Sequence, residues 1–354
     1  MGPDTGADAS THEAQVLGFP RRYVSLAALA LIIALALALR MYGLNWDEGI
    51  PFTPHPDERA ILFNVADLSP PAIDDLGSLF DAEESTWNPK WFPYGSFPLY
   101  LLRGVQLVSE SVGAEITDLR VTSRVISGLA DVATLFVVFL LGSRLYSRRV
   151  GLTAAGLLAV AVLHIQLSHY FAVDTLQAMF AVVALFFMYR VARKGGVGNS
   201  ALAGLFMGLG LATKASQLPI FLAFGVAQLM YLFNLAGSQD STGDFVDRLR
   251  TVVAGSAIGL AVAFLAFFIA QPYALLDWSR FKADFTEQSE MVRRIRDYPF
   301  TRQYADTIPY WYLIKQHVVW GLGLPLGLLA WGGGLFVAVR GLSWRHALGY
   351  VALG

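Results

Sequence analysis

Long apolar runs alternate with short polar segments along most of this chain. A membrane-spanning helix needs about 20 apolar residues, and eight runs approach or reach that length. They cover residues 24–41, 121–141, 150–170, 171–191, 201–212, 218–235, 252–270 and 312–339. The third and fourth runs abut, which predicts a tight hairpin between them. The pattern predicts an all-α protein that crosses a bilayer several times, a polytopic integral membrane protein.

One further apolar segment, 97–112, has a different pattern. Arg103, Gln106 and Glu110 recur at helical spacing and share one face, with apolar residues on the others. Such a helix lies in the membrane interface rather than crossing it. We therefore predict an interfacial helix within the first large loop.

The basic residues indicate the orientation. If 97–112 does not cross, the Arg- and Lys-containing loops 143–149, 190–195 and 340–345 lie on the same side as Arg21 and Arg22. The excess of positive charge marks the cytoplasmic side. We therefore expect a multi-pass protein of the cell membrane with its N-terminus in the cytoplasm.

The predicted organisation is a disordered cytoplasmic N-terminus, 1–22, followed by one transmembrane domain, 23–354. Two large loops, 42–120 and 271–309, then lie on the extracytoplasmic side. The last apolar run, 347–354, is too short to cross a bilayer. We therefore expect the natural protein to continue beyond this sequence.

Composition agrees with a membrane protein and excludes several functions. The chain is 55% hydrophobic and 15% charged, with a mean hydropathy of +0.50, whereas soluble domains carry roughly 25% charged residues. A net charge of −1 gives no indication of nucleic-acid binding. The absence of cysteine excludes disulfides, thiolate metal sites and thiol nucleophiles. His55 and His169 lack close ligand spacing, so no metal or other cofactor is indicated.

The first large loop contains adjacent carboxylates, Asp57 and Glu58, about a dozen residues after the first apolar run. Acidic residues after a proline are typical of a helix start. Carboxylates beside lipid are also energetically unfavourable, which makes them candidates for a functional site. A carboxylate at the membrane boundary can act as a base on a substrate dissolved in the membrane. The two interpretations are compatible.

Several motifs together resemble a known family. His55-Pro56-Asp57-Glu58 is similar to the Asp-Glu motif of GT-C-fold glycosyltransferases, in particular the protein O-mannosyltransferases and the aminoarabinose transferase that modifies lipid A. Further similar segments follow in the same order: Tyr94-Gly95-Ser96-Phe97-Pro98-Leu99-Tyr100, Arg124, Phe171-Ala172-Val173-Asp174-Thr175, Ala212-Thr213-Lys214-Ala215 and Pro309-Tyr310-Trp311-Tyr312. The chain departs from some relatives at Ser96 and Phe97, where they have a lysine before the proline.

This resemblance implies a GT-C-like helical bundle that transfers a sugar from a polyprenyl phosphate to an acceptor hydroxyl, with inversion. The acceptor can be a protein, a lipid or a glycan. Inversion needs a base for the acceptor proton and cations for the departing phosphate. Asp57 is then the candidate base, and Glu58 orients the acceptor or tunes Asp57. The other candidates bind substrate: Lys214 and Arg124 the phosphate, Asp174 the sugar or a cation, and His55 beside the base.

Structural alternatives exist for each of these residues. Lys214 can extend to the interface as an anchor, Arg124 can pair with Asp131 seven residues later on the same helix face, and Asp174 can cap a span. The aromatic residues 87–94 fit an interfacial belt. At the level of the whole chain, the rival function is a transporter or flippase for lipid-linked glycans, followed by a non-catalytic scaffold subunit.

Overall fold

The computed structural model describes residues 15–16, 19–114, 116–235 and 244–341. Positions 1–14 and 17–18 of the predicted disordered N-terminus, and the last apolar run at 347–354, lie outside this part of the chain. Two-residue strands β1 (Gln15–Val16) and β2 (Phe19–Pro20) form a minimal antiparallel pair. The rest of the secondary structure is helical, which confirms the all-α prediction.

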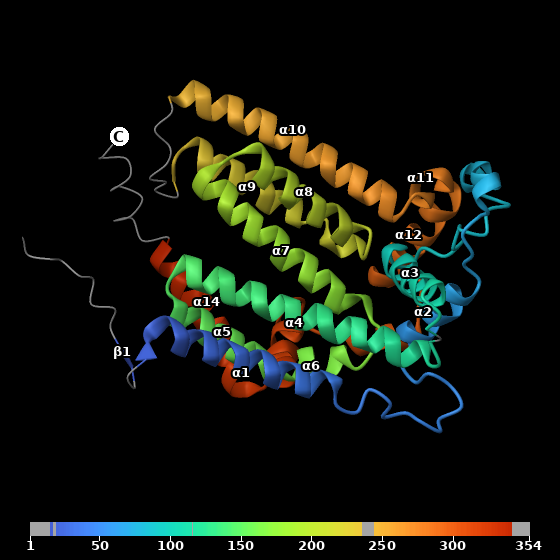
Figure 1. Cartoon of the computed structure of the whole chain (residues 1–354), viewed down its shortest axis with the longest axis horizontal. Helices are drawn as coiled ribbons and strands as arrows, with labels where there is room; N and C mark the ends of the chain where they lie inside the picture. Colours follow the sequence, from blue (N-terminus) through green and yellow to red (C-terminus); the bar gives the residue numbers. More distant parts are fainter. Residues whose placement is uncertain (1–14, 17–18, 115, 236–243, 342–354) are drawn as a thin grey trace, which may run out of the picture.

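Several helices run roughly along the long axis of the molecule (Figure 1). They are α1 (Arg21–Met41), α4 (Leu119–Leu145), α5 (Arg148–Ala159), α7 (Val173–Lys194), α8 (Val197–Leu211), α9 (Ile220–Leu232) and α10 (Phe245–Ala270). Within the described residues, five helical segments are long and apolar enough to cross a membrane: Tyr23–Met41, Leu119–Leu145, Val173–Lys194, Ala215–Leu232 and Phe245–Ala270. The chain is a multi-pass membrane protein, as its apolar pattern predicts.

Two of the predicted spans are not continuous helices. The run 150–170 is divided into α5 and α6 (Val162–Ser168), which meet at an angle of 58°. The run 312–339 is divided into α13 (Trp311–Gln316), a π-helical turn η4 (His317–Gly321) and α14 (Leu324–Gly341). Gly323 lies between the last two with φ of +79°, a conformation that glycine adopts without steric cost.

Short helices gather at one end of the bundle, here called the loop end (Figure 1). The first large loop contributes α2 (Pro56–Ala66), the 3₁₀ helix η1 (Ile73–Phe80) and α3 (Phe97–Ser111). A second loop contributes α11 (Tyr273–Leu276), α12 (Trp278–Val292) and the 3₁₀ helix η3 (Pro299–Tyr304). The basic ends of α4 and α7 lie at the opposite end, and α3 is not among the spanning helices.

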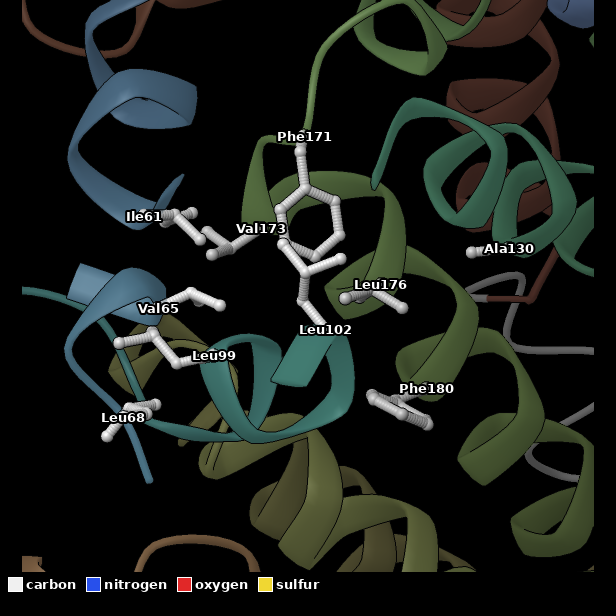
Figure 2. Close-up of a cluster of buried hydrophobic side chains, with 10 residues drawn as sticks. All are labelled: Ile61, Val65, Leu68, Leu99, Leu102, Ala130, Phe171, Val173, Leu176 and Phe180. Carbon is white, nitrogen blue, oxygen red and sulfur yellow. The ribbon is translucent and has the colours of Figure 1, made fainter. Parts of the chain in front are cut away.

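An apolar core fixes α2 and α3 against the spanning helices. Ten buried residues form it (Figure 2), from α2, α3, α4, α7 and the segments just after α2 and just before α7: Ile61, Val65, Leu68, Leu99, Leu102, Ala130, Phe171, Val173, Leu176 and Phe180. Burying an apolar side chain of this size stabilises a fold by about 1.5–3 kcal/mol. The core therefore holds the first turn of α2 in a defined position beside α7.

The two large loops are joined by buried polar contacts. The Ser85 hydroxyl lies 2.6 Å from the Tyr273 hydroxyl, and the Asn88 side-chain amide donates to Asp277 at 2.9 Å. The backbone N–H of Phe92 donates to Asp284 at 2.7 Å. The segment 85–92, which leads into α3, is thus held by α11 and α12.

Candidate active site

The helix α2 begins at the Asp-Glu pair, as the sequence predicts. His55 is the N-cap residue, and its Nδ1 accepts from the backbone N–H of Glu58 at 3.4 Å. The His55 ring also packs on Tyr170, with ring centroids 4.4 Å apart. Asp57 and Glu58 occupy the first turn, where the helix dipole favours negative charge. His55 thus has two structural partners, and the cap comes from it rather than from the carboxylates.

The two carboxylates have opposite environments. Glu58 is fully buried and accepts from Arg124 Nε at 2.8 Å, from Arg124 Nη2 at 2.7 Å and from the backbone N–H of Phe171 at 3.0 Å. Asp57 is half-buried and makes none of these structural contacts. Of the pair, Asp57 is therefore the carboxylate that a substrate can reach.

Arg124 is also fully buried, and every one of its N–H groups has a partner. Besides Glu58, it donates to both carboxylate oxygens of Asp47 at 2.8 Å and to the Leu44 carbonyl at 2.6 Å. A guanidinium has five N–H donors, and these five bonds use them all. The structural alternative in which Arg124 pairs with Asp131 is wrong, because Asp131 pairs with Arg40 instead.

Asp47 completes this arrangement, and sequence reasoning missed it. It bonds Arg124 in a bidentate manner and lies 3.1 Å from Arg120. Hydrogen bonds from Arg124 hold the pKa of Asp47 below its ordinary value of 3.8. We call Asp47, Glu58 and Arg124 the clamp. It ties the segment before α2, the first turn of α2 and α4 together.

Lys214 and Asp174 meet at the same end of the bundle. Lys214 Nζ lies 2.8 Å from Asp174 Oδ1, and both side chains are about one-third exposed, at 30% and 38%. Asp174 lies in the first turn of α7, which leaves the N-cap position to Ala172. Lys214 follows α8, in a turn whose Thr213 is buried. The two residues therefore form an ion pair that solvent or a ligand can reach.

Tyr94 connects this pair with Asp57. The Lys214 ammonium lies over the Tyr94 ring, 5.8 Å from its centroid, and the Tyr94 hydroxyl is near enough to Asp57 to feel the charge of its carboxylate. Burial, then the negative charge of Asp57 and of Asp174, raise the pKa of Tyr94 well above its ordinary value. The hydroxyl therefore stays protonated and can donate. The sequence assigned Tyr94 to an interfacial belt, and only its position beside Asp57 reveals this role.

Backbone pairing holds Tyr94 in place. The N–H groups of Gly95 and Phe97 donate to the carbonyls of Thr213 and Ala212, each at 3.1 Å. A Cβ on Gly95 would lie 1.8 Å from the Ala212 carbonyl oxygen, so only glycine permits this approach. The Tyr-Gly-Ser and Thr-Lys motifs, far apart in sequence, are thus paired in space.

An apolar cavity of about 200 Å³ adjoins the site. Its lining includes Tyr94, Ala215, Leu218, Phe267 and Phe285. No group of three or more His, Cys, Asp or Glu side chains suited to a metal ion occurs among the described residues. The site therefore offers an accessible carboxylate, an ammonium, a protonated phenol and an adjoining apolar surface.

Comparison with known proteins agrees with the motif resemblance. The family model described as dolichyl-phosphate-mannose-protein mannosyltransferase matches residues 111–264. Among solved structures, the chain is similar to the archaeal oligosaccharyltransferase AglB from Archaeoglobus fulgidus in complex with an inhibitory peptide and a dolichol-phosphate. The TM-score is 0.48 and the identity 16%, over 88% of this chain and 39% of that one. No curated protein matches the chain. The predicted resemblance to GT-C glycosyltransferases is confirmed by the family model.

Proposed function

We propose that this chain is a glycosyltransferase of the cell membrane that moves a sugar from a polyprenyl-phosphate donor to an acceptor hydroxyl. The loop end faces the extracytoplasmic side and the N-terminus is cytoplasmic. The observation that carries the proposal is the juxtaposition of Asp57, which is accessible, with Lys214, linked through Tyr94. A base for the acceptor and a cation for the leaving phosphate are what this reaction requires.

Asp57 takes the proton of the acceptor hydroxyl while the acceptor oxygen forms the new bond to the anomeric carbon. The bond from that carbon to the phosphate oxygen breaks, and the lipid phosphate leaves with its negative charge. Lys214 stabilises this charge as a point cation. Before the donor arrives, Asp174 neutralises Lys214 at 2.8 Å, so we assign Asp174 the role of a counter-ion that the phosphate replaces.

Glu58 and Arg124 take different roles from those expected of them. All five N–H donors of Arg124 already bind Glu58, Asp47 and the Leu44 carbonyl. We therefore assign Arg124 to positioning rather than to phosphate binding. Glu58 likewise positions α2, and with it Asp57. His55 caps the same helix, and we keep it, two residues before Asp57, as a candidate substrate contact.

The adjoining apolar cavity supports a lipid-linked donor. Phe267 of α10 and Phe285 of α12 line it, and Tyr94 and Ala215 connect it to the site. An isoprenoid chain buried there would leave its phosphate near Lys214. A soluble nucleotide sugar carries no long hydrocarbon chain to bury there.

The test is sugar transfer by purified protein in liposomes, offered a polyprenyl-phosphate sugar or a nucleotide sugar. We expect activity with the lipid donor alone. Lys214→Ala should raise the KM for that donor, and Lys214→Arg should retain part of the affinity because the charge is kept. Lys282→Ala, which removes an exposed lysine of α12, is the matched control and should be neutral. Transfer from the nucleotide sugar in lipid free of polyprenyl phosphate would overturn the proposal.

A further inference from the structure

A second buried ionic cluster lies within the helical bundle, apart from the site. Arg40, near the end of α1, is fully buried, and its Nε donates to Asp131 of α4 at 2.6 Å. Its Nη1 donates to the carbonyls of Ala159 at 3.0 Å and Ala36 at 3.2 Å, and its Nη2 donates to that of Leu158 at 3.3 Å. The guanidinium thus links α1, α4 and the end of α5.

The two α5 carbonyls belong to the point where the third span breaks. Sharp bends in helices arise at proline, at glycine, or where a side chain inserts into the hydrogen-bond ladder. No proline occurs in 148–168, and both glycines of α5 precede the break. A buried helix end in a membrane leaves carbonyls without partners, which is costly, and it favours a nearby cation. Arg40 supplies both the donors and the charge.

Asp131 also holds the other half of the broken span. Its second carboxylate oxygen contacts Nδ1 of His164, which lies on α6 directly after the break. One carboxylate therefore faces the guanidinium that caps α5 and the imidazole carried by α6. The direction of α6 relative to α5 is fixed through these two contacts.

The far end of α6 reaches the first turn of α2. His169 Nε2 lies 2.9 Å from the Tyr42 carbonyl oxygen. Tyr170 packs on the His55 cap, and the Phe171 N–H donates to Glu58. A rotation of α6 at the break would move all three contacts, and with them the helix that carries Asp57.

We propose that Arg40, Asp131 and His164 are positioning residues that set the angle of the broken span and thereby the placement of Asp57. The cluster acts through the backbone of α6 and contacts no substrate. Its effect on catalysis rests on the proposed function, whereas its effect on the position of α6 does not.

The experiment measures hydrogen exchange and transfer kinetics in two variants. His164→Leu leaves the Arg40–Asp131 pair intact, so it tests α6 without exposing a buried charge. The double change Arg40→Leu with Asp131→Leu removes both charges together, because a single change would leave one unpaired. Gln228→Leu, which breaks a buried 3.0 Å hydrogen bond to Ser200 between α8 and α9, is the matched control.

We expect faster exchange in residues 160–171 and in α2 for both variants, with α8 and α10 unchanged. The kcat should fall about 10–100-fold, as for a misplaced catalytic group. The donor KM should stay unchanged, because Lys214 is positioned by α8 and not by α6. The control should change neither quantity. Wild-type exchange in 160–171 in both variants would overturn the positioning role. If exchange is altered in the variants but the wild-type protein shows no glycosyl transfer, the positioning role stands and the proposed function is rejected.

Discussion

Replacing Glu58 by Gln most clearly distinguishes the structural role of Glu58 from the proposed catalytic role of its neighbour Asp57. Glu58 is fully buried and accepts three hydrogen bonds, two of them from a guanidinium. The amide cannot neutralise Arg124, and its NH₂ group faces donors instead of accepting from them. Removing one partner of a buried ion pair typically costs about 3–5 kcal/mol. Asp57→Asn, at a half-buried position outside the clamp, should cost far less.

The assay is thermal unfolding in detergent, followed by intrinsic tryptophan fluorescence. At roughly 2 °C per kcal/mol, the midpoint for Glu58→Gln should fall by roughly 6–10 °C, whereas the midpoint for Asp57→Asn should stay near that of the wild type. Glu48→Gln makes the same chemical change at an exposed position of the same loop and serves as the control. Equal midpoints for Glu58→Gln and Glu48→Gln would refute the clamp.

Three further outcomes are expected. Gly95→Ala should raise the donor KM, because its Cβ would collide with a carbonyl at 1.8 Å, whereas Gly104→Ala, which meets nothing within 4 Å, should be neutral. The neighbouring guanidinium lowers the pKa of Asp47 below 3.8, so the clamp contributes fully at neutral pH and its contribution falls as the pH drops below about 4. Asp47→Asn should reduce that acid dependence in unfolding scans. In this cysteine-free chain, an impermeant thiol reagent applied outside cells should label Glu84→Cys but not Arg149→Cys, both exposed positions, and the reverse pattern would invert the proposed orientation.

The sequence predicted the elements better than their contacts. Apolar length located the five helices that are long enough to span a membrane, and proline followed by two acids located the start of α2. The pairing of Arg124 could not be predicted from helix spacing, because its partner Asp47 lies 77 residues away in an irregular segment. Nothing local distinguishes Asp47 from other loop acids.

The break in the third span could not be predicted from the sequence for a similar reason. Residues 157–163 read as one apolar run, and the side chain that stabilises the break, Arg40, comes from α1. Tyr94 was placed in an aromatic belt because its sequence neighbours are Trp and Phe. Its link to Asp57 and Lys214 depends on the pairing of Gly95 with Thr213, which joins segments more than a hundred residues apart.

The role of Asp57 as the base is tested most directly by single-turnover transfer from a polyprenyl-phosphate sugar by Asp57→Asn in liposomes. Asn is nearly isosteric and cannot take a proton at neutral pH. The proposed role predicts a rate about 10²–10⁴-fold below that of the wild type, with an unchanged unfolding midpoint and unchanged donor binding. A rate near that of the wild type would contradict it and leave Asp57 as a residue of the helix start.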